Sequence, residues 1–218
     1  MNSSADIRRA GAAIRLTEPG VIAVIRAPSA GVVVPLAAAL VAGGVTALEI
    51  TTSTPDYAAA IRAARSALGP RALVGAGTIM DAQAAETALA AGAEFIISPV
   101  FRPELVPLAH GAGCPVLLGA YTPTEAQRVH DSGADFVKLF PADALGPGYF
   151  RALRTPLPHL RLVPTGGVDV TNAAEFRRAG CVAIGVGGSL IRPEWVRDDD
   201  WPALTRAAAA LVQTWSKG

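Results

Sequence analysis

The chain has 218 residues, 51% of them apolar, which is enough to form a sizeable core in one large α/β domain or two small ones. Its 19 basic and 18 acidic residues leave a net charge of +1, which gives no electrostatic basis for binding nucleic acid or an anionic membrane surface. No apolar run approaches the ~18 residues of a transmembrane helix, and residues 1–9 are followed by no apolar signal core. We therefore expect a cytoplasmic protein.

Helical and strand-like patterns alternate along the whole chain. Residues 5–16 place apolar side chains at helical spacing, and further helices are predicted over 32–42, 56–67 and 81–91. Eight apolar runs typical of strands cover residues 21–26, 47–52, 72–77, 95–99, 115–120, 136–140, 161–165 and 181–186. A closing helix over 201–215 should direct Leu204, Ala208, Leu211 and Trp215 inward.

The regular alternation predicts the fold class. Strand starts recur every 20 to 26 residues, and strands that alternate with helices form parallel β-α-β units. Eight such units fit a (β/α)₈ TIM barrel, and continuous apolar runs are typical of strands that are covered on both faces. A doubly wound open sheet is the alternative, but no GxGxxG follows the first strand.

No linker or change in composition divides the chain, so we expect a single α/β domain over residues 1–218. Within it, residues 1–20 would form an extra N-terminal helix, 21–192 the barrel core and 193–218 a C-terminal helix.

Lys138 interrupts the apolar run Phe136-Val-Lys-Leu-Phe140. Lysine is almost never fully buried unless it is paired, because burial disfavours its charged form. A desolvated amine is suited to nucleophilic attack on a carbonyl group. The alternative is that Lys138 lies at the solvated end of the strand and only its aliphatic stem is covered.

Glu49 is a second charged residue inside a predicted strand, in Ala47-Leu-Glu-Ile-Thr. It could simply form an ion pair with Lys138 or Arg26 at the mouth of the barrel. A lysine and a glutamate that share the interior of one barrel are also candidates for a nucleophile and a proton shuttle.

Glycine-rich segments follow the last two predicted strands, Thr165-Gly-Gly167 and Gly185-Val-Gly-Gly-Ser189. Glycine lets the backbone approach a ligand closely, and backbone N–H groups at helix N-termini favour anions. These two loops are where barrels commonly hold phosphate, so the pattern favours a phosphorylated substrate.

The cysteines and histidines form no metal-ligand pattern. Cys114 and Cys181 open predicted strands without CxxC spacing, and we expect them to be small buried residues. His110, His130 and His159 are scattered, and we expect surface positions for them.

Seven segments together resemble the family of class I aldolases for 2-keto-3-deoxy-6-phosphogluconate (KDPG), which includes 4-hydroxy-2-oxoglutarate and phosphogalactonate aldolases. The match runs from about residue 20 to 192 and is carried by Ile22-Ala-Val-Ile-Arg26, Leu48-Glu-Ile-Thr51, Val74-Gly-Ala-Gly-Thr78, Phe95-Ile-Ile-Ser-Pro99, Val137-Lys-Leu-Phe-Pro141, Val163-Pro-Thr-Gly-Gly167 and Gly185-Val-Gly-Gly-Ser189.

The resemblance implies that Lys138 forms a Schiff base with a 2-keto acid, with neither metal nor cofactor, and that Glu49 is the general acid/base. It further implies a homotrimer that acts on a small 2-keto acid or phosphosugar. The implied substrate-binding residues are Arg26, Thr51, Ser53, Thr78, Pro99, Phe140 and Thr165, and the implied phosphate-binding residues are Gly166, Gly167, Gly187, Gly188 and Ser189.

One position departs from the family pattern, since many members have arginine where this chain has Ser53. The grip on a carboxylate or phosphate would then come from Arg26 or be weaker, which leaves the substrate open. The alternatives are 4-hydroxy-2-oxoglutarate, an unphosphorylated 2-keto-3-deoxy sugar acid, or binding of a phosphosugar without catalysis. An epimerase or decarboxylase on the same fold would not need an imine, and fold alone does not decide between them.

Overall fold

The structure is a computed structural model, and residues 3–218 are described below. Eight parallel strands form one sheet in the order β7-β6-β5-β4-β3-β2-β1-β8. The strands are β1 (Val21–Ile25), β2 (Ala47–Thr51), β3 (Leu73–Gly77), β4 (Ile96–Ile97), β5 (Val116–Ala120), β6 (Phe136–Leu139), β7 (Leu162–Pro164) and β8 (Ile184–Val186).

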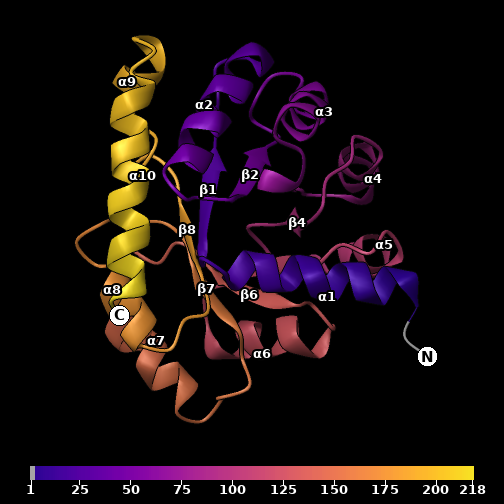
Figure 1. The fold of residues 1–218 in the computed structure, drawn as a ribbon. Coiled ribbons are helices and arrows are strands. Elements are labelled where there is room, and N and C mark those ends of the chain that lie inside the picture. The colour runs from indigo at the N-terminus through magenta and orange to yellow at the C-terminus, as the bar shows by residue number, and fades with distance from the viewer. Residues whose placement is uncertain (1–2) are drawn as a thin grey trace.

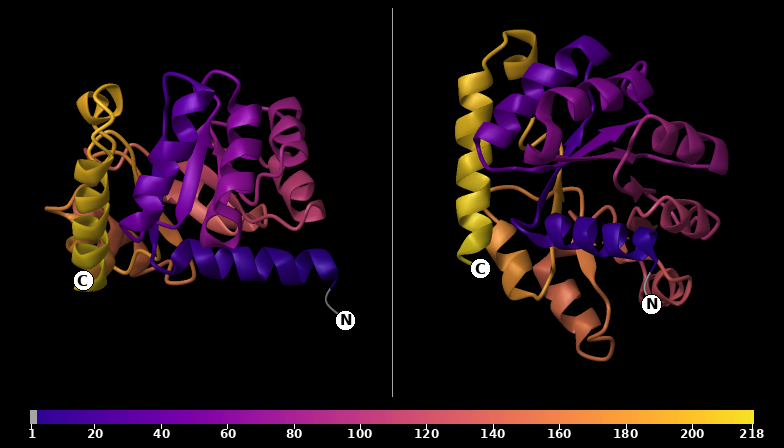
Figure 2. Two further views of the ribbon diagram at one scale, coloured as in Figure 1. Left: turned by 45° about the horizontal axis from the view of Figure 1, so that its top comes forward. Right: turned by 45° about the vertical axis from the view of Figure 1, so that its right-hand side comes forward.

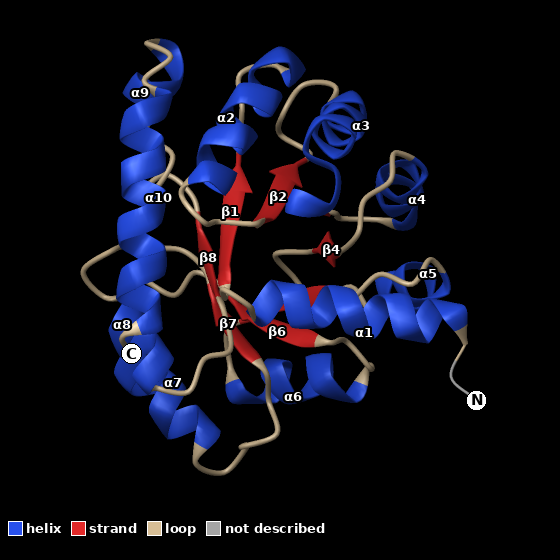
Figure 3. Ribbon diagram, viewed as in Figure 1, coloured by secondary structure: helices blue, strands red, loops and turns tan. Residues whose placement is uncertain are grey.

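The sheet curls into a barrel with helices around it, as Figure 3 shows with the strands in red and the helices in blue. Between β7 and β8 the ring is joined by a single bridge, Thr165 to Gly185, and by the Val182 N–H, which donates to the Leu162 carbonyl over 3.0 Å. The fold is the predicted single-domain (β/α)₈ barrel.

Helix α1 precedes the first strand and the other helices follow strands in sequence. Helix α10 runs along the barrel beside α2 and α8 (Figure 1). The helices are α1 (Ser4–Thr17), α2 (Ala30–Ala42), α3 (Tyr57–Leu68), the 3₁₀ turn η1 (Gly69–Arg71), α4 (Ala82–Ala90), α5 (Leu105–Gly111), α6 (Pro123–Asp131), α7 (Gly146–Arg154), α8 (Ala173–Arg178), α9 (Pro193–Arg197) and α10 (Trp201–Ser216). The four residues predicted to face inward from the last helix are all buried. Within residues 3–218, no helix is both long and apolar enough to cross a membrane.

Three strands are shorter than the predicted apolar runs by two residues or more, whereas the other five differ by one residue. The run 95–99 contributes only Ile96 and Ile97, because the Gly119 N–H of β5 donates to the Val100 carbonyl beyond the run instead of to Ser98. The run 161–165 is regular only over Leu162–Pro164. The run 181–186 begins its strand at Ile184, because the Cys181 N–H still donates to the Phe176 carbonyl of α8.

The core has two parts. One lies between the barrel and its helices. The other fills the barrel where the strands begin, and we call it the floor cluster. It consists of Ala13 and Leu16 of α1 with Ile22, Ala47, Leu73, Phe95, Ile97, Leu117, Phe136, Val163 and Ala183. Both views in Figure 2 show α1 running across this end of the barrel, so α1 closes it.

Polar contacts also attach α1 to the barrel. An Arg9 Nη1–H donates to the His110 ring, 2.6 Å from Nδ1, and His110 Nε2 lies 2.9 Å from Asp135 Oδ2. The prediction of a surface position is therefore wrong for His110, whose side chain is half-buried in this network, whereas His130 and His159 are exposed.

Both cysteines are buried, as predicted. Burial raises the pKa of the Cys114 thiol to about 11 and that of the Cys181 thiol to about 12. Both thiols are therefore protonated and unreactive near neutral pH.

The floor cluster predicts that substitutions of Leu16 and Ile14, both in α1, differ sharply in their effect on stability. Leu16 is 1% exposed and should lose about 2–5 kcal/mol of unfolding free energy on replacement by alanine. Ile14 is 57% exposed, and Ile14→Ala should change stability by about 0.5 kcal/mol or less. Urea unfolding of both variants measures the difference, and equal losses would show that α1 does not close the barrel through Leu16.

Candidate active site

Strand periodicity brings Glu49 and Lys138 into the barrel. Ala47 and Phe136 belong to the floor cluster, so the residues two positions further along β2 and β6 point inward one layer above it. The layer above the floor cluster therefore contains two ionisable side chains from different strands.

The two side chains form a buried ion pair. Lys138 Nζ lies 3.5 Å from Glu49 Oε1, and the side chains are 6% and 2% exposed. Glu49 Oε1 accepts no hydrogen bond within the described residues. Of the two partners expected for Glu49, the structure thus selects Lys138, and it excludes the solvated strand end considered for this lysine.

Interior glycines supply the space that this layer needs. A Cβ at Gly77 would overlap the Glu49 carboxylate, and a Cβ at Gly119 would overlap the Pro99 carbonyl. On the other side of the barrel, a Cβ at Gly185 would overlap Thr165 Oγ1. Each glycine accommodates a neighbouring polar group, which any larger side chain would displace.

A cavity of about 190 Å³ opens above this layer. Its lining includes Arg26, Phe140 and Thr165 together with both glycine-rich loops, Gly166–Gly167 and Gly187–Ser189. A Cβ at Gly187 would lie 3.4 Å from Arg26 Nη1, so the guanidinium of Arg26 lies beside the second loop.

The glycine-rich loops have free donors. Within residues 3–218, the backbone N–H groups of Gly166, Gly167, Gly188 and Ser189 donate to no other group of the protein. The Ser189 hydroxyl donates to the Val168 carbonyl over 2.6 Å, which ties the two loops together. Four N–H groups and one guanidinium around one cavity provide the chemistry that binds a phosphate or carboxylate.

Phe140 connects this cavity with a second one of about 160 Å³, which Pro99, Gly119, Tyr121 and Glu125 also line. The Phe140 ring centroid is 5.8 Å from Lys138 Nζ. The amine of Lys138 therefore lies below the ring that borders both cavities.

Three of the predicted substrate-binding residues, Thr51, Ser53 and Thr78, line neither cavity. The Thr51 hydroxyl donates to the Ile25 carbonyl over 3.1 Å and lies 2.7 Å from Ser53 Oγ. Thr78 has a left-handed backbone with φ +60°, and its carbonyl accepts from the Thr52 hydroxyl. The binding roles of Thr51, Ser53 and Thr78 remain predictions.

Sequence reasoning did not predict that Gly77, Gly119 and Gly185 make room for neighbouring polar groups, although glycine within a strand often marks a close approach by another group. It also missed Asp169, which lines the cavity of the glycine-rich loops. Hydrogen bonds from the Thr171 side chain and backbone hold the pKa of that carboxyl below its usual range. In the part of the chain described, no three His, Cys, Asp or Glu side chains are grouped as metal ligands would be.

Comparison with known proteins gives a consistent result. The family model for KDPG and KHG aldolase matches residues 13–207. The chain is 39% identical over 181 residues to the 2-dehydro-3-deoxy-phosphogluconate aldolase of Treponema pallidum (strain Nichols), covering 83% of this chain and 86% of the relative. It is 35% identical over 155 residues to the 2-dehydro-3-deoxy-6-phosphogalactonate aldolase of Escherichia coli (strain K12), covering 71% and 76%.

Among solved structures, KDPG aldolase from Legionella pneumophila superposes with a TM-score of 0.80 at 27% identity, covering 92% of this chain and 97% of that one. That structure holds pyruvate, captured at low pH as a covalent carbinolamine intermediate.

The close contact at Gly77 predicts that two glycine-to-alanine substitutions change stability in different directions. Gly77→Ala should lower the unfolding free energy by about 1–3 kcal/mol, because the new methyl group must displace the buried carboxylate of Glu49. Gly148→Ala in α7 meets no neighbour and should be neutral or stabilising by up to about 1 kcal/mol. Urea unfolding measures both, and a fully stable Gly77→Ala variant would contradict the packing described.

Proposed function

Because the chain belongs to the KDPG and KHG aldolase family of class I carbon–carbon lyases, we propose that it cleaves 2-dehydro-3-deoxy-6-phosphogluconate or a close 2-keto-3-deoxy phosphosugar acid. The products are pyruvate and glyceraldehyde 3-phosphate. The observation that carries this proposal is the buried Lys138–Glu49 pair beneath a cavity lined by two glycine-rich loops.

In the first half of the reaction, the neutral amine of Lys138 attacks the C2 ketone of the substrate. The resulting carbinolamine loses its hydroxyl as water and becomes a protonated imine. Glu49 lies within 3.5 Å of the amine, close enough to take a proton from the attacking nitrogen and return it to the departing hydroxyl. No metal takes part in the proposed reaction.

In the second half, the iminium nitrogen accepts the electron pair of the C3–C4 bond. Glu49 takes the proton of the C4 hydroxyl, directly or through one water, while the bond breaks and the aldehyde forms. The enamine that remains on Lys138 is protonated at C3, and hydrolysis of the imine releases pyruvate and regenerates the amine.

Burial makes each charge depend on the other. Removing one member of a buried pair leaves an uncompensated charge in a medium of low dielectric constant, at a cost of several kcal/mol. The free lone pair on Glu49 Oε1 is also available to a substrate proton, since no protein donor occupies it within residues 3–218. The pair is therefore suited to moving a proton at Lys138 rather than to stability alone.

The glycine-rich loops would hold the end of the substrate away from Lys138. Their four backbone N–H groups and the guanidinium of Arg26 suit a phosphate, and Phe140 would lie over the carbon chain between the phosphate and the imine. Pro99 and Thr165 would line the same path, with Thr51, Ser53 and Thr78 nearer the pyruvate end.

Ser53 supports a second class of substrates, those without a phosphate. Its side chain is exposed and hydrogen-bonded to Thr51, and it provides no positive charge where an arginine would. With Arg26 as the remaining cation at the cavity, 4-hydroxy-2-oxoglutarate or an unphosphorylated sugar acid would compete on more equal terms. The chemistry at Lys138 is the same for both classes.

We further propose a cytoplasmic homotrimer, as the family resemblance implies. Exposed apolar side chains on the loops after β3, β4 and β5 support an assembly of this kind: Met80, Val100, Phe101 and Tyr121. These loops lie at the same end of the barrel as the candidate active site.

Replacing the carboxylate should separate imine formation from turnover. Glu49→Gln should lower kcat by about 10²–10⁴, because the C4 hydroxyl loses its proton acceptor, yet should still form a reducible imine with pyruvate. Lys138→Ala is the control and should lose both activities, since the only other lysine, Lys217, is at the C-terminus. Near wild-type turnover of Glu49→Gln would reduce Glu49 to a structural partner.

Substrate class is tested by comparing kcat/KM for the phosphorylated and the unphosphorylated 2-keto-3-deoxy sugar acid. We expect the phosphorylated substrate to be preferred, and Arg26→Gln to lower its kcat/KM by about 10–100-fold through loss of a charged hydrogen bond. The same variant should change kcat/KM for the unphosphorylated substrate less. Equal rates on both substrates, unaffected by Arg26→Gln, would favour the unphosphorylated class.

A further inference from the structure

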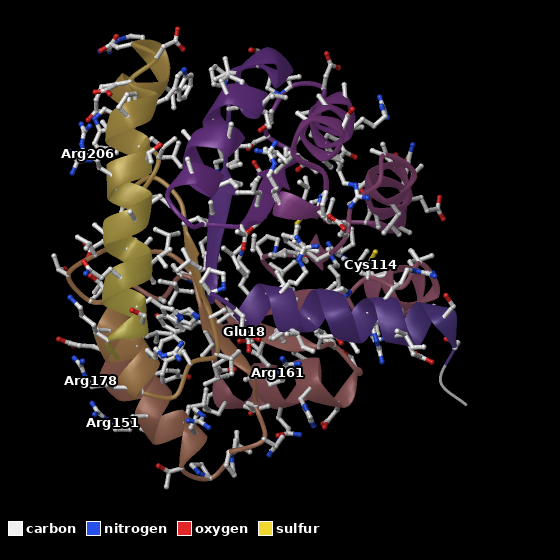
Figure 4. All side chains as sticks on the ribbon, viewed as in Figure 1. Glu18, Cys114, Arg151, Arg161, Arg178 and Arg206 are labelled. Atoms are coloured by element: carbon white, nitrogen blue, oxygen red, sulfur yellow. The ribbon has the colours of Figure 1, made fainter. Side chains whose placement is uncertain are left out.

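A separate cavity of about 480 Å³ lies at the opposite end of the barrel from the candidate active site. It is enclosed by α1 on one side and by the segments that lead into β3, β4 and β5 on the other. Figure 4 labels Cys114, one of its lining residues, beside α1, α4 and α5. Its volume is within the range of pockets that bind small ligands, about 300–1,000 Å³.

One face of α1 shapes this cavity. Arg8, Gly11, Ala12 and Arg15 all line it, and their spacing of three, four and seven residues places them on one side of the helix. Gly11 and Ala12 leave the middle of that face open, while the two arginines stand at its ends. Seven residues at a rise of 1.5 Å separate their backbones by about 10 Å.

The lining carries an excess of positive charge. Arg8, Arg15 and Arg65 contribute three guanidinium groups against the single carboxylate of Glu94. That carboxylate is already engaged, because it pairs with Arg65 and accepts the Val74 N–H. Within residues 3–218, Arg8 and Arg15 of α1 have no carboxylate partner.

The bonds that Arg8 and Arg15 do make use only part of their donors. Arg8 Nη1 donates to Ser4 Oγ over 2.8 Å, and Arg15 Nη2 donates to the Pro70 carbonyl over 3.1 Å. Among residues 3–218, neither arginine lies within 4.0 Å of a carboxylate oxygen. Each guanidinium has five N–H donors in a planar fork, which suits bidentate binding of phosphate or carboxylate.

The arginines are not needed to satisfy the helix ends nearby. Near the end of α4 the Leu89 carbonyl accepts from the Gly92 N–H, and near the end of α5 the His110 carbonyl accepts from the Gly113 N–H. Arginine at a helix C-terminus is favourable in general, but these two carbonyls are satisfied without it.

We propose that this cavity binds a small dianion whose two anionic groups, phosphate or carboxylate, are held by Arg8 and Arg15. The ligand would bridge α1 to the segments before β3 and β4, and would stabilise the attachment of α1 to the barrel. The site is independent of the reaction at Lys138, since no residue of the proposed catalytic machinery lines it.

Inorganic pyrophosphate is the probe, and hydrogen–deuterium exchange read by peptide mass spectrometry locates its binding. We expect slower exchange in residues 4–17 and 91–114, and a Tm that rises with pyrophosphate concentration. The glycine-rich loops would also respond, in peptides from 165–189, so the two sites are read separately. Arg8→Gln combined with Arg15→Gln should weaken the response of residues 4–17 at least tenfold and leave that of 165–189 unchanged.

A matched control removes the same charge elsewhere. Arg151 and Arg178 are exposed on α7 and α8, away from Cys114 in Figure 4, and Arg151→Gln with Arg178→Gln should leave binding at residues 4–17 unchanged. Protection confined to 165–189 would overturn the proposal. So would equal weakening by the two double variants, because it would reduce the effect to net charge. Neither result would bear on the aldolase reaction, which is assayed without pyrophosphate.

Discussion

The candidate active site depends on one buried ion pair, Lys138 with Glu49, enclosed in the interior of the barrel. Taking either charge out of water alone would cost several kcal/mol, so each side chain requires the other. Both also lie beneath a cavity with unused hydrogen-bond donors. This combination connects the fold to a reaction in which an amine must lose and regain a proton beside a carbonyl compound.

The remaining architecture supports that pair from two directions. Below it, the floor cluster and α1 exclude water from the start of the strands, with Leu16 and Phe136 filling the interior. Above it, Gly77 and Gly119 leave space for the Glu49 carboxylate and the Pro99 carbonyl. The site therefore combines a layer of the barrel, in which small residues on some strands leave room for polar groups on others, with the two glycine-rich loops above it.

The sequence allowed the barrel and its two interior charges to be predicted because both follow from local patterns, whereas the partner of Glu49 was left open between Lys138 and Arg26. Strand periodicity was enough to identify Lys138 and Glu49 as charges inside apolar runs. Contacts that depend on the register between strands could not be predicted in this way. Gly77 matters because the register of β2 and β3 places the Glu49 carboxylate against it. The burial of His110 likewise depends on a contact with Arg9, which is distant in sequence. The early end of β4 depends on how it pairs with β3 and β5.

The most direct test of this account is borohydride reduction in the presence of pyruvate, followed by intact mass measurement and peptide mapping. The chain has only two lysines, so Lys217 serves as an internal control in every experiment. The account predicts a single reduced pyruvate adduct, on the peptide that contains Lys138. A folded protein that forms no adduct with pyruvate in excess, or forms it only on Lys217, would contradict the assignment of Lys138 as the nucleophile.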